Sequence, residues 1–352
     1  MRLRSLAQLN ARNLRTPRIE FPDGVVAVVG RNAAGKSNLL EAAYLGCTGE
    51  LPAGRVSDVV RHGQTEGYVA VEIEHDEGLS RVEVGLAPGR KHLRLDGQHA
   101  RALDVARVVT AVLLTPEDAD LIHGAPSGRR GYLDGLLTKV SARYALLLRE
   151  YLRVVEQRNA LLRGAQGRHD TDDPTLPAWT DRFIRLGTEI DAMRVRAVTR
   201  LAPLAADVYR DVAGCGDLGL TLARAGSGAD VAEALAAAAA EERARGVTPV
   251  GPHRDDLAIT LDGHDLRTFG SRGEARTAAL ALRTAEYRLL SEKHGEPPVL
   301  LIDDFTAELD AHRRAYLLAL TAGTPQVLVT GTEAPPRHDA LFTITDGEVR
   351  GA

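Results

Sequence analysis

The segment that decides the fold lies near the start of the chain and reads Val25-Val-Ala-Val-Val-Gly-Arg-Asn-Ala-Ala-Gly-Lys-Ser37. Its five apolar residues predict a buried strand, and the residues that follow match the phosphate-binding loop G-x4-G-K-[ST], or P-loop. A helical stretch, 38–45, comes next. Backbone N–H groups at a helix N-terminus bind anions, so the motif stands in the context that it needs. The sequence therefore predicts an α/β domain that binds phosphate groups.

The residues of this loop have separate predicted roles. Lys36 is expected to reach the β- and γ-phosphates and to act in catalysis, while Ser37 coordinates Mg²⁺. Arg31 is either a nucleotide contact or a solvated side chain. The predicted cofactor-binding positions of the segment are Gly30, Arg31, Asn32, Ala33, Ala34, Gly35, Lys36, Ser37 and Asn38.

A second motif near the end of the chain is Val299-Leu-Leu-Ile-Asp-Asp304, an apolar strand that ends in two carboxylates, as in a Walker B segment. Asp303 is expected to hold Mg²⁺ through water, and Asp304 to orient the attacking water as a general base. An apolar strand ending in acids is common by itself. Together with the P-loop, it indicates a site for nucleotide hydrolysis.

A third motif, Phe269-Gly-Ser-Arg-Gly-Glu274, precedes the helical run 275–291. A serine hydroxyl and free amides at a helix start can bind an anion, whereas the simpler interpretation is an N-cap. Ala307-Glu-Leu-Asp310 follows the Walker B segment. The order of these motifs along the chain is more specific than any one of them.

The periodicity of the sequence divides the chain. Short apolar or alternating runs up to about residue 114 predict strands, and Asp96-Gly97 and Asp262-Gly263 predict hairpin turns. Apolar residues at helical spacing then predict one helix over 129–163, roughly 50 Å long, a second over 178–209 and an Ala-rich helix near 230–245. Strand patterns return afterwards. We therefore expect a head of residues 1–120 plus 245–352, interrupted by a helical arm of residues 121–244.

Composition narrows the function classes. The net charge of −4 excludes a uniformly basic nucleic-acid-binding surface, but residues 121–210 hold 15 lysines and arginines against 10 acidic residues. That excess indicates either DNA contact or ordinary solvated helices. Apolar runs are too short for a membrane span, and no signal-peptide pattern occurs, so a cytoplasmic protein without a membrane partner is expected. Cys47 and Cys215 suggest neither a disulfide nor a zinc site.

Taken together, the motifs resemble those of the RecF recombination mediators, ATPases with an ABC-type head related to Rad50 and the SMC proteins. The resemblance runs from end to end of the chain. Besides the motifs above, its carriers are Thr115-Pro-Glu-Asp118, Gly128-Arg-Arg-Gly-Tyr-Leu-Asp134 and Gly251-Pro-His-Arg-Asp-Asp256. It implies an ABC-type P-loop head with an antiparallel helical insertion.

The resemblance also implies a function: DNA repair and replication restart by an ATP-dependent homodimer that binds duplex, gapped or junction DNA and helps to load recombinase on single strands. RecR and RecO are the implied partners, with ATP and Mg²⁺ as cofactors. In the dimer, Ser271, Arg272, Gly273 and Glu274 of one subunit cap the nucleotide of the other, and Asp310 lies across the seam. Arg129, Arg130 and Lys139, at the base of the arm, are the expected DNA contacts.

Some positions depart from the usual ABC pattern. Asp304 stands where a glutamate is common, which suggests slow hydrolysis. Glu117 is the nearest candidate for the missing Q-loop glutamine and is expected near the metal, and Thr330 stands where many heads carry histidine. Their roles in sensing the γ-phosphate are left open, as is a role of His253 and Arg254 near nucleotide or DNA.

Three other classes fit less well. A transporter subunit is disfavoured by the long helical insertion and the missing histidine. A GTPase lacks the Asn-Lys-x-Asp motif that recognises guanine. An OLD-type nuclease needs a further metal-binding domain, for which no residues remain.

Overall fold

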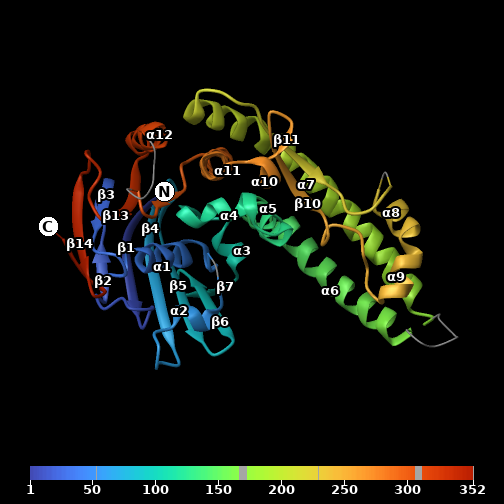
Figure 1. Ribbon diagram of the computed structural model, residues 1–352. Helices are drawn as coiled ribbons and strands as arrows, with labels where there is room; N and C mark the ends of the chain where they lie inside the picture. Colours follow the sequence, from blue (N-terminus) through green and yellow to red (C-terminus); the bar gives the residue numbers. More distant parts are fainter. Residues whose placement is uncertain (53, 166–172, 229, 306–310, 352) are drawn as a thin grey trace. The chain divides into compact units, whose positions relative to one another are not determined.

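The computed structural model describes residues 1–52, 54–165, 173–228, 230–305 and 311–351. They form two compact units, and Figure 1 labels most of their helices and strands. The first comprises Met1–Ala119, Asp207–Gly216 and Arg276–Ala352, and the second comprises Asp120–Ala206 and Asp217–Ala275. The expected division into a head of residues 1–120 plus 245–352 and an arm of residues 121–244 remains a prediction. The second compact unit also takes in residues 245–275.

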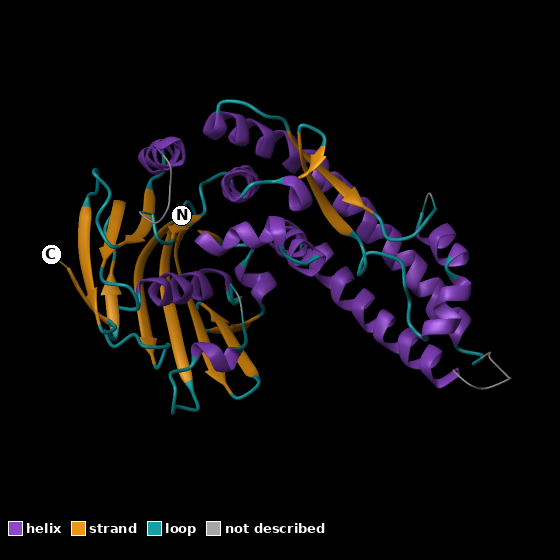
Figure 2. Cartoon of the chain, in the orientation of Figure 1, coloured by secondary structure: helices purple, strands orange, loops and turns teal. Residues whose placement is uncertain are grey.

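One sheet of the first unit is antiparallel, in the order β2-β1-β4-β5-β6-β7. Figure 2 draws the strands of the chain in orange and its helices in purple. Its strands are β1 (Arg2–Leu9), β2 (Arg18–Glu20), β4 (Gly67–His75), β5 (Gly78–Ala87), β6 (Arg90–Leu95) and β7 (Gln98–Ala100). Asp96 and Gly97 join β6 to β7 with φ angles of 48° and 78°. Two consecutive positive φ angles are typical of a tight hairpin turn, so the strand and turn predictions are confirmed here.

The other sheet of this unit has the order β15-β14-β3-β13-β12-β8. Its strands are β3 (Gly24–Val29), β8 (Ala111–Leu114), β12 (Val299–Ile302), β13 (Gln326–Gly331), β14 (Ala340–Thr345) and β15 (Glu348–Gly351). All neighbouring pairs are parallel except β14 and β15. The strands β3, β8 and β12 are apolar along their length, and β13 is buried throughout with Val327, Leu328 and Val329 at its centre, as expected for parallel strands covered on both faces.

The helix α1 (Lys36–Thr48) packs against strands of both sheets and joins them in one core. Leu39, Leu40 and Leu45 are fully buried there. Gly46 allows the helix to approach β4 closely, because a Cβ at this position would lie 2.4 Å from a methyl carbon of Val71. This packing fixes the start of α1, where the P-loop ends. The smaller helices of this unit are α2 (Val56–Val59), α3 (Ala102–Val105), the 3-10 helix Pro116–Ala119 and α12 (Ala311–Ala322).

The second unit is built around long helices. These are α5 (Pro126–Val140), α6 (Ala142–Ala165) and most of α7 (Leu176–Ala213), accompanied by the short helices α4 (Asp120–His123), α8 (Val231–Ala237), α9 (Ala239–Arg245) and α10 (Leu266–Phe269). A small antiparallel sheet contains β9 (Leu218–Ala223), β10 (Asp256–Leu261) and β11 (His264–Asp265). Tyr151 of α6 stacks on Phe183 of α7, with ring centroids 5.4 Å apart. The predicted helical hairpin is therefore confirmed, with α7 longer than the predicted 178–209.

The prediction of one helix over 129–163 was wrong, because the chain breaks at Ser141. This residue is extended, with φ −139° and ψ 111°. Its hydroxyl accepts a hydrogen bond from the N–H of Tyr144 at 3.3 Å, as an N-cap does. The Ala-rich run likewise forms two helices, divided at Ala238. Apolar spacing continued through both breaks, so the sequence pattern did not show them.

The helix α11 (Arg272–His294) begins in the second unit and continues in the first. Within the described residues, no helix combines the length and the apolar character needed to cross a membrane.

Candidate functional site

Four loops of the first unit meet at the carboxyl edge of the parallel sheet. Successive strands of the sheet, β3, β13, β12 and β8, lead into the P-loop, the turn after Gly331, the Walker B carboxylates and the turn 115–118. In open α/β sheets, ligands bind outside the carboxyl ends of the strands. The sheet order thus brings together motifs that lie almost 300 residues apart in the chain.

The P-loop has the backbone of an anion-binding turn. Ala33 and Gly35 adopt left-handed conformations, with φ of 64° and 114°. Lys36 is buried, and its Nζ donates to the carbonyl oxygens of Gly30 at 2.9 Å and Arg31 at 3.1 Å. Gly35 is the N-cap of α1, and no described side chain caps that helix. The first N–H groups of α1 are therefore available to a phosphate.

The Walker B carboxylates follow β12. Thr330, which is buried, donates its hydroxyl proton to Oδ1 of Asp303 at 2.5 Å. The N–H of Asp304 donates to the same Asp303 oxygen at 3.1 Å and to the Thr330 hydroxyl at 3.0 Å. These bonds orient Asp303. The sequence left the role of Thr330 open. Its contact with Asp303 could not be predicted, because it depends on the pairing of β12 with β13.

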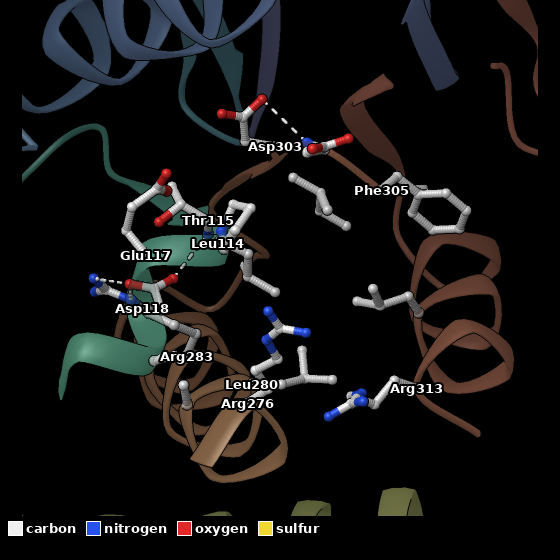
Figure 3. Close-up of a pocket in the computed structure, with 16 residues that line it drawn as sticks. Leu114, Thr115, Glu117, Asp118, Arg276, Leu280, Arg283, Asp303, Phe305 and Arg313 are labelled. Atoms are coloured by element: carbon white, nitrogen blue, oxygen red, sulfur yellow. Dashed lines mark hydrogen bonds and ion pairs between the residues drawn. The ribbon is translucent and has the colours of Figure 1, made fainter. Parts of the chain in front are cut away.

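The adjacent acids Glu117 and Asp118, in the turn after β8, have different surroundings. Asp118 is buried, and its carboxylate accepts from Arg283 of α11 at 2.7 and 2.9 Å. Burial raises the pKa of Asp118, while the Arg283 guanidinium opposes that rise. Glu117 is exposed at the edge of the site, on the side of Asp303 (Figure 3). The structure thus leaves Glu117 available for a ligand, and Asp118 holds the turn in place.

A further carboxylate, Glu41 of α1, belongs to the same neighbourhood. Burial raises the pKa of Glu41, the negative charges of Asp303 and Glu117 raise it further, and Arg12 lowers it. Arg12 and Glu41 form an ion pair. No sequence motif singled out Glu41, although it lies four residues after Ser37 on the same helix.

The residues present fit a Mg²⁺ ion that is held mainly by phosphates and water. No group of three or more acidic, histidine or cysteine side chains in the described ranges could hold a metal ion by itself. Mg²⁺ at nucleotide sites keeps several waters and takes one or two protein ligands besides substrate phosphates. Ser37 at the start of α1 and Asp303 directly after β12 could supply such ligands.

A cavity of about 330 Å³ adjoins the Walker B residues (Figure 3). Its walls come from the turn after β8, from Asp303 to Phe305, from α11 and from α12. Arg276, Arg283 and Arg313 line it. The cavity therefore extends the site from Asp303 toward α11 and α12.

The third motif, Phe269 to Glu274, lies in the second unit, and the N-cap interpretation of Ser271 is confirmed. The N–H of Glu274 donates to the Ser271 hydroxyl at 3.2 Å, and Glu274 Oε2 accepts from the N–H of Ser271 at 2.8 Å. This is a reciprocal capping box. Ser271, Arg272 and Gly273 are exposed at the helix start. Asp310 lies outside the described residues.

The expected DNA contacts do not form a free cationic surface. Arg129 is only 4% exposed, pairs with Asp256 at 2.7 Å and donates to the carbonyl oxygens of Leu121, Ile122 and Gly124. Arg130 donates to the carbonyl of Asp255 at 2.9 Å, and Lys139 is buried. These placements indicate that Arg129 holds α5 to β10 within the second unit and that Lys139 is largely shielded from solvent. Sequence gives the charge of a side chain but not its burial.

His253 also has a structural environment. Its Nε2 bonds to the carbonyl of Thr248 at 3.1 Å, and its Nδ1 to the Tyr151 hydroxyl at 2.8 Å. A carbonyl only accepts, so Nε2 carries the proton and Tyr151 donates to Nδ1. Burial lowers the pKa of His253 to about 4. The neutral ring helps to hold α6 against the turn before β10, while Arg254 is exposed.

Comparison with known proteins agrees with this geometry. Residues 2–341 match the family described as the RecF/RecN/SMC N terminal domain. The DNA replication and repair protein RecF of Deinococcus radiodurans is 49% identical over 336 residues, which cover 96% of this chain and 92% of that protein. The RecF of Streptomyces avermitilis is 37% identical over an alignment of 356 positions, which covers 94% of this chain and 95% of that protein.

Solved structures show the same architecture. The structure of the recombination mediator protein RecF-ATP in the RecFOR pathway is 29% identical, covers 99% of this chain and 97% of its own, and superposes with a TM-score of 0.92. An SMC head domain from Pyrococcus furiosus, 16% identical over 99% of this chain and 95% of its own, has a TM-score of 0.54 and shares the fold. The expected ABC-type head with a helical insertion is confirmed. The chain belongs to the RecF family, within the wider group of RecF, RecN and SMC N-terminal domains.

Proposed function

We propose that this chain binds ATP with Mg²⁺ at the carboxyl edge of its parallel sheet and hydrolyses it slowly. One observation carries the proposal: a buried P-loop lysine after β3 and an oriented Walker B carboxylate after β12 lie at the same edge of one parallel sheet, with only β13 between their strands. The similarity to the RecF-ATP structure supports ATP as the ligand.

Each group has a role in this reaction. Lys36 exchanges its carbonyl partners for the β- and γ-phosphates, where its charge stabilises the transferred group. Asp303, held by Thr330, and the Ser37 hydroxyl would hold the water shell of a bound Mg²⁺, which would supply positive charge beside the phosphate oxygens. Asp304 orients the attacking water. Its side chain is one methylene shorter than glutamate, which supports slow turnover.

We propose further that ATP drives two copies to dimerise and that the dimer binds duplex or junction DNA during recombinational repair. The exposed start of α11 supports this model. The Ser271 hydroxyl accepts from Glu274 and still has its own proton to donate to a γ-phosphate of the partner copy. Membership of the RecF family supports RecR and RecO as protein partners and the loading of recombinase as the outcome.

Replacing the P-loop lysine tests the nucleotide site. Lys36→Met is expected to weaken ATP binding at least a hundredfold, because a buried cation between phosphate oxygens is lost. Titration with a fluorescent ATP analogue measures the affinity. Lys293→Met, which removes an exposed lysine at the end of α11, is the matched control and should bind as wild type does. Retained micromolar affinity in Lys36→Met would contradict the assignment.

Light scattering with and without ATP tests dimerisation. Ser271→Asp keeps an N-cap residue but places a negative charge where the partner's γ-phosphate would bind. It should bind ATP as a monomer and fail to dimerise, whereas Ser227→Asp, at an exposed position of the same unit, should dimerise normally. If Ser271→Asp dimerises like wild type, capping across the dimer is ruled out.

A further inference from the structure

The carbonyl of Ala34, in the middle of the P-loop, is held by two segments that are remote in sequence. It accepts the N–H of Gly347 at 2.9 Å and the side-chain Nδ2 of Asn13 at 3.4 Å. In a trans peptide, the C=O and the following N–H point in opposite directions. Two donors on the Ala34 carbonyl therefore turn the N–H of Gly35 away from Asn13 and Gly347.

The Asn13 side chain is itself oriented by a chain of hydrogen bonds. Its Oδ1 accepts from Nδ2 of Asn38 at 2.8 Å, and Arg12 donates to Oδ1 of Asn38 at 3.2 Å. Since Oδ1 is used by Asn38, the amide group of Asn13 faces Ala34. Arg12 continues the chain to Glu41. All of these groups come from the turn after β1 and from α1.

Two glycines make room for this arrangement. A Cβ on Gly35 would lie 2.7 Å from Oδ1 of Asn13, and a Cβ on Gly347 would lie 1.9 Å from the Asn13 carbonyl oxygen. Both glycines have positive φ, 114° and 81°. The N–H of Arg15 also donates to the Gly347 carbonyl at 2.7 Å. The turn after β1 and the β14–β15 hairpin thus pack against each other and against the P-loop.

We propose that Asn13 is a positioning residue for the P-loop. With the N–H of Gly347, it holds the Ala34 peptide so that the Gly35 N–H faces the β-phosphate before the nucleotide arrives. The inference rests on the proposed ATP site. It explains why an asparagine with no expected contact to nucleotide is inserted between α1 and the loop, and it assigns to the C-terminal hairpin a part in nucleotide binding.

The test uses two Asn13 variants in the full chain. Asn13→Ala removes both hydrogen bonds, whereas Asn13→Asp keeps an acceptor for Asn38 and loses the donor to Ala34. Asn10→Ala is the matched control, because Asn10 lies in the same segment and donates to the carbonyl of Glu66 instead. We measure affinity for ADP and ATP with a fluorescent nucleotide, KM and kcat for ATP, and the melting temperature without nucleotide.

Asn13→Ala should lose about tenfold in affinity for ADP and for ATP alike, because both carry the β-phosphate. KM should rise by the same factor with kcat unchanged, since the interaction is equal in the ground and transition states. Asn13→Asp should lose at least as much nucleotide affinity, and its melting temperature should equal that of wild type. Asn10→Ala should keep the wild-type nucleotide affinity.

Unchanged nucleotide affinity in Asn13→Ala overturns the inference. So does an equal loss in Asn10→Ala, or a loss in Asn13→Asp that is matched by a lower melting temperature, because either result means a general structural role. If the wild-type chain binds no ATP, the proposed function fails first. Wild-type binding with unaffected Asn13 variants rejects the inference alone.

Discussion

Thr330 fixes the orientation of Asp303 by a hydroxyl hydrogen bond, and its replacement tests the importance of that bond. Thr330→Val keeps the shape of the side chain and removes the donor. We expect ATP turnover to fall about tenfold while ATP affinity changes less than about twofold, as for other outer partners of metal-binding groups. Steady-state kinetics and nucleotide titration measure the two effects.

Thr330→Ser serves as the control, because it retains the hydroxyl and should keep most of the turnover. Equal rates in wild type and Thr330→Val would mean that Asp303 needs no such support.

His253 makes stability depend on pH in the acidic range. Its folded pKa of about 4 lies below the ordinary value of 6.5, so the unfolded chain binds the proton more tightly. Stability is therefore complete above about pH 6.5 and is lost as the pH falls toward 4. The contribution is on the order of 2 kcal/mol, at about 1.4 kcal/mol for each pKa unit with allowance for relaxation.

Urea unfolding at pH 7.5 and pH 5 measures this effect in wild type and in His253→Gln, which keeps a donor and an acceptor but does not titrate. The variant should lose less stability between the two pH values than wild type. Asp255 shifts in the opposite sense, because burial raises its pKa, so the difference between the two proteins is the informative quantity. An equal loss of unfolding free energy in wild type and His253→Gln would show that protonation of His253 does not destabilise the fold.

At the scale of elements, the hairpin of α6 and α7 carries the exposed cations that Arg129 and Lys139 do not supply. A groove of about 770 Å³ lies along these helices. Arg149 and Arg153, both exposed and one helical turn apart, line it together with Arg182. Trp179, the chain's one tryptophan, lies in the same groove, where Arg182 is 6.0 Å from its ring centroid.

We therefore expect Arg149→Ala/Arg153→Ala to weaken duplex DNA binding and to reduce the salt slope by up to about two, because each phosphate contact releases about one counterion. Binding of DNA should also change the fluorescence of Trp179. Arg243→Ala/Arg245→Ala on α9 removes two exposed arginines elsewhere in the unit and should bind as wild type does. Unchanged affinity and slope in the α6 variant would place the DNA contact outside this groove.

At the scale of the whole molecule, nucleotide and DNA should act on one equilibrium. If ATP favours a dimer and the dimer binds DNA better, then DNA must favour ATP binding by the same factor, because linkage is reciprocal. We expect a factor of five or more, about 1 kcal/mol of coupling. DNA titrations with and without a non-hydrolysed ATP analogue, and the converse nucleotide titrations, measure both sides. Absence of coupling would mean that the ATP cycle serves some other partner.

The sequence alone determined the local parts of this protein. The P-loop, the Walker B strand and the Asp-Gly hairpins depend on contiguous residues, since backbone preference and apolar spacing act over a few positions. The helical hairpin was predictable for the same reason, from apolar residues at steps of three and four. The break at Ser141 was not, because one capping hydroxyl interrupts the helix while the spacing continues.

Only the tertiary structure decided which remote residues act together. Thr330 reaches Asp303 and Asn13 reaches Ala34 because sheet order and turns bring them within hydrogen-bond distance. The same holds for burial: Arg129 and Arg149 are the same residue type, yet packing buries one against Asp256 and exposes the other. A charge or a hydroxyl is visible in the sequence. Its partner and its access to water follow from contacts between segments that lie 21 to 127 residues apart in these examples.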